Sequence, residues 1–120
     1  MSSYVDGFVI PVPRAKIEDY RKVAEVACKV WMDHGAVDYR ECIGEDLTVK
    51  DMVSFPQLAG AGPEETVVFA WISYESREHR DAVNARVMAD PRMKEMMGSD
   101  PQLFHSKRMA YGGFQTIVAP

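Results

Sequence analysis

The segment at residues 66–74 constrains the fold more than any other part of the sequence, because an extended chain there is apolar on both sides. Successive side chains of a β-strand point to opposite faces of the sheet. One face would carry Val67, Phe69 and Trp71, and the other Val68, Ile72 and Tyr74. A strand of this composition is covered on both sides. The remainder of the chain, or a second copy of it, must supply both covers.

The first third of the sequence predicts a strand followed by a helix. Residues 4–12 are rich in Val, Ile, Phe and Tyr, and the strand ends at prolines that cannot donate to a neighbouring strand. From Ala15 the apolar residues recur every three or four positions as far as Trp31, which indicates an amphipathic helix. Gly35 is typical of the left-handed residue that ends such a helix.

The rest of the chain predicts three strands and two helices. Residues 37–43 alternate enough for a half-exposed strand, and the loop at residues 44–65 is long enough to suggest a functional role, with Phe55 and Leu58 folding back onto the body. Ser76 is expected to cap a helix through Ala89 that turns Ala82, Val83 and Val87 inward. Asp90 and Pro91 then begin a short helix that closes at Gly98, and residues 108–118 form the last strand.

This order of elements is that of the split βαβ arrangement. We therefore expect an α+β, ferredoxin-like βαββαβ fold, with a four-stranded antiparallel sheet, helices on one face and a single domain over residues 1–120. Helices on one face leave the other face of the sheet bare, although the strand at residues 66–74 is apolar there too. An exposed apolar patch of that size is unfavourable for a monomer. The sequence thus predicts a homodimer joined through the open face of the sheet.

Composition excludes several classes of partner. The 120 residues carry 14 basic and 18 acidic side chains, a net charge of −4, and the bases are interleaved with acids, so nucleic-acid binding is not expected. No apolar run approaches the roughly 20 residues that span a bilayer, and the first residues lack the pattern of a signal peptide. Cys28 and Cys42 are too few for a disulfide framework and are expected to be reduced and buried. We therefore expect a cytoplasmic protein with no membrane or nucleic-acid partner.

His79 is the residue best suited to acid–base catalysis. It falls in the first turn of the expected second long helix, where the helix dipole favours a neutral imidazole that can act as a base. The alternative is a polar side chain on a solvated surface. His34 and His105 lie far from it in the sequence, and the three histidines lack the spacing of zinc or non-haem iron ligands, so no metal site and no cofactor is predicted.

Paired glycines and aromatic residues suggest a ligand pocket between the sheet and the helices. Glycines inside a strand mark a bulge or a close approach, and a close approach can leave room for a ligand. Tyrosine hydroxyls would then fix a small apolar molecule. The same aromatic spacing also suits an ordinary core. The candidate pocket residues are Tyr20, Trp31, Tyr39, Trp71, Tyr111, Gly112, Gly113 and Phe114.

Four segments together resemble the YbaA-like family of small bacterial proteins, a domain-of-unknown-function family. They are residues 4–13, 71–81, 84–91 and 107–114, of which Lys-Arg-Met-Ala-Tyr-Gly-Gly-Phe is the most specific. The family is similar to the dimeric α/β-barrel superfamily, which contains small monooxygenases, haem proteins, isomerases and non-catalytic modules. The resemblance implies the fold and the dimer but no catalytic residues. A homodimer that binds or transforms a small apolar or aromatic metabolite is one hypothesis, and a non-catalytic binding or regulatory dimer is the other.

Overall fold

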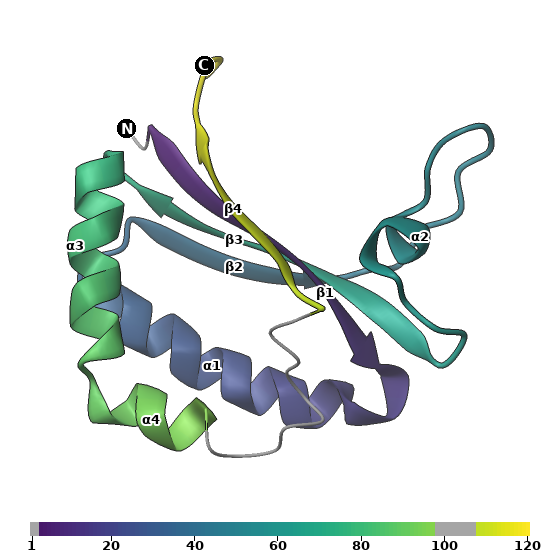
Figure 1. Ribbon diagram of the computed structural model, residues 1–120, viewed down its shortest axis with the longest axis horizontal. Helices are drawn as coiled ribbons and strands as arrows, with labels where there is room; N and C mark the ends of the chain where they lie inside the picture. Colours follow the sequence, from purple (N-terminus) through teal and green to yellow (C-terminus); the bar gives the residue numbers. More distant parts are fainter. Residues whose placement is uncertain (1–2, 98–107) are drawn as a thin grey trace.

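In the computed structural model, which describes residues 3–97 and 108–120, an antiparallel sheet is packed against helices on one face (Figure 1). The four strands stand in the order β2-β3-β1-β4. This is the ferredoxin-like α+β arrangement, which confirms the predicted fold. The elements are β1 (Tyr4–Pro13), the 3-10 turn η1 (Arg14–Lys16), α1 (Ile17–Asp33), β2 (Asp38–Ile43), α2 (Phe55–Ala59), β3 (Glu65–Tyr74), α3 (Arg77–Met88), α4 (Pro91–Met97) and β4 (Ala110–Gln115).

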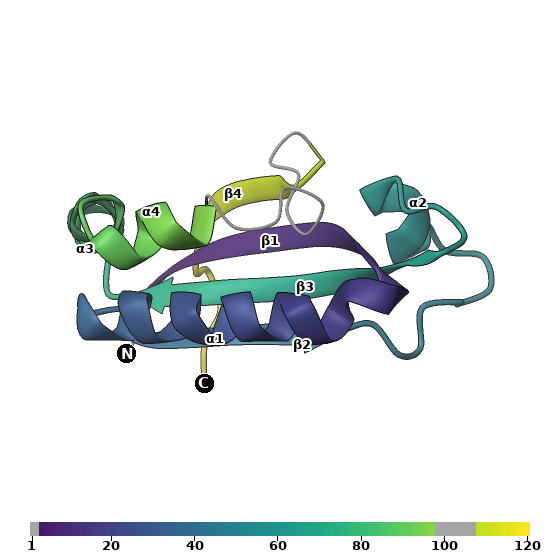
Figure 2. The same ribbon diagram turned by 90° about the horizontal axis from the view of Figure 1, so that it is seen from below.

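The core lies between the sheet and the helices. Seen from below, α1 runs along β3 and β2, and α3 and α4 lie toward one end of the sheet (Figure 2). Tyr20, Ala27 and Val30 of α1 are buried, as the predicted helical stripe requires. On α3, Val83 and Val87 are fully buried, but Ala82 is exposed, so its predicted inward position is wrong. The helix turns Ala82 to solvent because Val83 and Val87, four residues apart, define its buried face.

The predicted helix ends are confirmed where the structure describes them. The Ser76 side chain accepts a hydrogen bond from the backbone N–H of His79 at the start of α3. Asp90 does the same for Arg92 at the start of α4. Gly35 has a positive φ of 104°. The predicted end of α4 at Gly98 lies outside the described residues.

Three sequence predictions are corrected by the structure. The long loop contains the short helix α2, whose N-cap Ser54 and left-handed Gly60 were signals present in the sequence. The last strand is shorter than residues 108–118, since β4 pairs with β1 only from Ala110 to Gln115. Cys42 is exposed rather than buried, because it lies on the edge strand β2 and faces away from the helices.

Candidate functional site

The face of the sheet that α1 does not cover carries a hollow of about 650 Å³. Its position follows from strand register, because directly paired residues of antiparallel strands share a face. Trp71 of β3 pairs with Gly7 of β1, which pairs in turn with Gly112 of β4. The core side chains occupy the alternate positions on the other face. The lining is almost entirely apolar and consists of Val5, Gly7, Phe8, Val9, Phe69, Trp71, Ala110, Tyr111, Gly112 and Phe114.

Two glycines in register explain why the sheet is hollowed here. Gly7 and Gly112 are cross-strand partners, so neither strand places a side chain between the flanking aromatic residues. The Phe114 ring leans over this bare backbone, and a Cβ built on Gly7 would lie 3.2 Å from it. Phe114 itself is 62% exposed. The result is an open, aromatic-walled depression rather than a flat sheet.

The eight predicted pocket residues are divided between the two faces of the sheet. Trp71, Gly112 and Phe114 line the hollow on the open face. Tyr111 borders the hollow, but it pairs with Phe8 and its side chain lies on the helix face. At Gly113 the backbone lies so close to Tyr4 that a side chain would not fit, because a Cβ there would lie 2.1 Å from the Tyr4 hydroxyl. The other three, Tyr20, Trp31 and Tyr39, lie on the helix face and are packed in or against the core.

On the helix face, Tyr20 and Tyr39 donate their hydroxyl hydrogen bonds to the same carboxylate. Both bind Glu41 of β2, at 2.5 Å for Tyr39. Burial and the Glu41 charge raise the pKa of both tyrosines, so both hydroxyls stay protonated. The Trp31 indole donates to the side-chain oxygen of Asn84 at 3.1 Å. These aromatic residues hold α1 against the sheet, and their polar tips are directed at partners within the chain.

A buried ion pair that the sequence analysis did not identify lies on the same face. Asp6 of β1 is 1% exposed, and one of its oxygens accepts a hydrogen bond from the Arg80 guanidinium of α3 at 2.7 Å. Tyr111 donates to its other oxygen at 3.2 Å and accepts from Arg80 at 2.8 Å. The guanidinium carbon also lies 5.1 Å from the centre of the Tyr4 ring. Burial raises the pKa of Asp6, although the Arg80 charge opposes the shift.

A signal for this pair was present in the sequence. Tyr4, Phe8 and Ile10 share the inward face of β1 with Asp6 by simple alternation. A carboxylate in that row must find a partner, because an unpaired buried charge is costly. The alternation rule identifies Asp6, but it does not identify Arg80, which lies 74 residues later.

His79 lies in the first turn of α3, half-buried, and its ring is engaged within the chain. Its Nδ1 accepts a hydrogen bond from the backbone N–H of Glu75 at 3.0 Å. The ring lies edge-on to Tyr74 with their centres 5.9 Å apart. His79 is not among the residues that line the hollow. Its contacts are those of a residue that fixes the start of α3.

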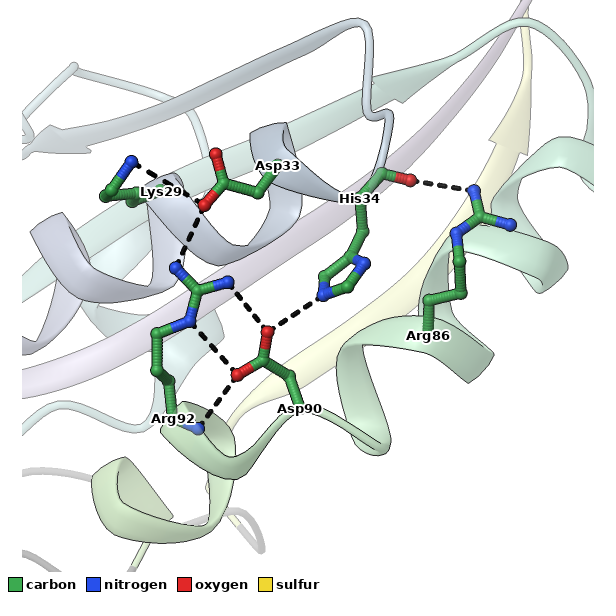
Figure 3. A network of polar contacts seen from close by, with 6 residues as sticks. All are labelled: Lys29, Asp33, His34, Arg86, Asp90 and Arg92. Atoms are coloured by element: carbon green, nitrogen blue, oxygen red, sulfur yellow. Dashed lines mark hydrogen bonds and ion pairs between the residues drawn. The ribbon is translucent and has the colours of Figure 1, made fainter.

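A second polar network joins the end of α1 to α4 (Figure 3). The Asp90 carboxylate contacts His34 Nε2 at 2.9 Å and accepts from Arg92 at 2.7 Å. Arg92 also reaches Asp33 at 2.9 Å, and Arg86 donates to the backbone oxygen of His34 at 2.7 Å. Hydrogen bonds from Arg92 and His34 hold the pKa of Asp90 well below its usual value. The contacts of His34 with Asp90, of Asp33 with Arg92 and of Arg86 with His34 hold the end of α1 against α3 and α4.

Two kinds of site are absent from the part of the chain that the structure describes. Within residues 3–97 and 108–120, no group of three or more His, Cys, Asp or Glu side chains is arranged to hold a metal ion. Over the same residues, no helix combines the length and apolar character needed to cross a membrane.

The comparisons with known proteins agree with this architecture. The chain is 44% identical to the uncharacterized protein YbaA of Escherichia coli K12 over 115 residues, which are 96% of this chain and 97% of that protein. The same identity and coverage hold for YbaA of Shigella flexneri.

Solved structures with similar folds are more distant in sequence. A NIPSNAP-family protein of unknown function from Agrobacterium tumefaciens aligns with a TM-score of 0.64 and 19% identity, over 96% of this chain and 88% of that one. A dimeric ferredoxin-like protein from an uncultured marine organism aligns with a TM-score of 0.57 and 8% identity, over 99% and 91%. At these identities the likeness concerns the fold alone. The family model described as protein of unknown function (DUF1428) matches residues 3–105, and the chain belongs to that family.

Proposed function

We propose that this protein is a homodimer, joined through the open faces of its two sheets, that binds a small apolar or aromatic molecule in the hollow between them. The observation that carries the proposal is the aromatic-walled hollow above Gly7 and Gly112. It differs from the hypothesis drawn from the sequence in one respect, since we propose the ligand site on the open face and not between the sheet and the helices.

The composition of the open face supports the dimer. Phe69 and Phe114 are large, apolar and exposed, and Trp71 lies on the same face in contact with Phe69, at 5.6 Å between ring centres. An exposed apolar surface of this kind marks a site of association. A two-fold dimer buries the same patch on both copies at once. The similar fold of a protein described as dimeric adds support.

The dimensions and chemistry of the hollow support the ligand. Its volume of about 650 Å³ falls within the roughly 300–1,000 Å³ range of small-molecule sites. A second sheet packed about 10 Å away would close it from above. Trp71 and Phe114 offer ring faces on which an aromatic molecule can stack. Trp71, Gly112 and Phe114 form the proposed site. Tyr111, whose hydroxyl binds Asp6 and Arg80 on the helix face, and His79 have no part in it.

Sedimentation velocity over a wide concentration range tests the dimer. The native chain should sediment as a dimer, and Trp71→Asp should sediment as a folded monomer because it places a charge in the joined face. Val26→Asp is the matched control, since Val26 is 43% exposed on α1, away from the open face, and this variant should remain dimeric. A native chain that stays at 13.5 kDa at every concentration would overturn the proposal.

Titration with 2-naphthol, followed by NMR, tests the ligand. The chain has two tryptophans. Trp71 lies in the hollow, and Trp31, on the other face, serves as an internal control. We expect the Trp71 indole N–H signal to shift and that of Trp31 to stay. Gly112→Val should weaken binding about tenfold or more by filling the floor, a loss of roughly 1.4 kcal/mol. A Cβ at Gly112 meets Phe114 only at ordinary distance, 3.7 Å, so the fold should survive.

Gln115→Val, on the same strand but with its side chain on the other face, is the control and should leave the affinity unchanged. If neither tryptophan signal moves, the hollow is a contact surface for the second copy and not a ligand site.

A further inference from the structure

The open face has a projecting apolar segment at each end. At the end where β1 stops and β3 starts, residues 44–64 extend from the body and include α2; we call these residues the arm (Figure 1). At the other end, residues 116–120 follow β4; we call them the tail. The tail begins beside the start of β1, because Thr116 donates a backbone hydrogen bond to Ser3 at 2.9 Å. The hollow lies between the two segments.

The arm is firmly attached at its base. Arg108 binds Glu65 at 2.7 Å and the backbone oxygen of Gly60 at 2.9 Å. Phe55 of α2 packs edge-on against Phe69 of the open face, with ring centres 6.0 Å apart. The short helix therefore rises above the open face at this end of the sheet.

Beyond this base, the arm presents apolar side chains to solvent. Met52 is 72% exposed and Val53 is 75% exposed. The tail does the same with Ile117 at 91% and Val118 at 85%. In Figure 1 the tail and the arm both lie above the sheet, whereas α1 lies below it. Two apolar surfaces thus flank the hollow without covering it.

Helix dimensions restrict how two open faces can meet. When two sheets pack with their strands within about 30° of each other, the two-fold axis between the open faces runs either along the strands or across them. An axis along the strands brings arm over arm, so two α2 helices, each about 10 Å across, would have to share one end of the gap. Packed sheets lie only about 10 Å apart, which leaves room for one helix and not for two. An axis across the strands places each arm over the partner's tail.

We infer that the arm of one copy packs on the tail of the other, so that Met52 and Val53 of one chain meet Ile117 and Val118 of its partner at both ends of the dimer. This inference rests on the proposed dimer and adds its orientation. Each hollow is then closed at its ends by side chains that a single copy leaves exposed, and the ligand site is incomplete without the second copy.

Cross-linking between two single-cysteine variants tests the orientation. Cys28 and Cys42 are both free, so each is first replaced by serine. Val53→Cys and Ile117→Cys are then made in separate preparations, mixed to allow exchange of subunits, and treated with a short bismaleimide. We expect a product of twice the 13.5 kDa chain mass from the mixture and none from either variant alone. Val26→Cys, on the outer side of α1, should give no product with either variant.

The outcomes separate this inference from the function on which it rests. A product from Val53→Cys alone would place the axis along the strands and overturn the orientation, while leaving the dimer intact. A dimer in sedimentation that yields no product in the mixture would also overturn it. A monomer in sedimentation would overturn the proposed function itself.

Discussion

The two faces of the sheet have opposite characters. On the helix face, charged groups that lose contact with water have partners. The buried Asp6 pairs with Arg80, and the partly buried Asp90 pairs with the more exposed Arg92. Among the described residues, no buried side-chain nitrogen or oxygen lacks a hydrogen bond. On the open face, the hollow is almost wholly apolar and exposed. The comparison teaches that one face is complete within a single chain, whereas the other exposes surface that only another molecule can cover.

Removal of Arg80 should have the largest effect on the helix face. Arg80→Met leaves the Asp6 carboxylate buried without its cation, and breaking a buried pair in this way costs about 3–5 kcal/mol. Urea denaturation at pH 7 measures the loss in the free energy of unfolding. A loss below about 1 kcal/mol would mean that Asp6 is reached by water, and the contrast between the faces would weaken.

The same variant should respond to pH in a defined direction. Burial already raises the pKa of Asp6 above the ordinary value of 3.8, and loss of Arg80 removes a charge that lowers it. When the pKa of a carboxyl is higher in the folded than in the unfolded protein, the free energy of unfolding falls as the pH rises from the lower pKa to the higher one. Lowering the pH from 7 toward the ordinary pKa of 3.8 should therefore reduce the difference in unfolding free energy between Arg80→Met and the native chain. A difference that grows on acidification would contradict this account.

Two neighbouring residues of β3 allow the faces to be compared directly. Ile72 is 2% exposed in the core, and Ile72→Ala should lower the free energy of unfolding by about 3 kcal/mol at any protein concentration. Trp71 lies on the open face, so part of the loss in Trp71→Ala should appear only at concentrations where the dimer forms. Thermal unfolding at several concentrations measures both. If the thermal stability of the two variants depends equally on protein concentration, Trp71 and Ile72 do not differ in the way proposed for the two faces.

The smallest effect should come from a single helix cap. Ser76→Ala removes the hydrogen bond to the backbone N–H of His79 and should cost about 1 kcal/mol. Urea denaturation measures this loss, which should not depend on protein concentration. Ser76→Asp, which keeps an acceptor at the cap, should restore most of the stability. If Ser76→Asp is no more stable than Ser76→Ala, the cap is not what fixes the start of α3.

Much of the fold follows from local rules that act on particular residues. Alternation in residues 66–74 separates Trp71 from Ile72 correctly, and Ser76, Asp90 and Gly35 mark helix ends through their capping chemistry. These rules succeed because each depends on a few neighbouring residues. The short helix α2 escaped prediction because five residues are too few to show a helical period.

The candidate site was harder to predict because it depends on register. The paired glycines drew attention to β4, but the hollow needs Gly112 to lie opposite Gly7, a residue 105 positions earlier. The aromatic residues could not be assigned to a face until the strands were paired. Tyr20 and Tyr39, which are suited to holding a ligand, have their hydroxyls committed to Glu41.

Glu41 also affects how copies of the chain associate with one another. It lies on β2, an outer strand of the sheet, and turns its charge inward, where two phenols hold it. An inward-directed charge on an edge strand hinders a strand of another molecule from pairing with that edge and extending the sheet. Because the open face of the sheet is so apolar, copies of the chain are brought close together, and the charge of Glu41 at the edge strand disfavours edge-to-edge association. Face-to-face pairing is then favoured over an extended sheet of many copies.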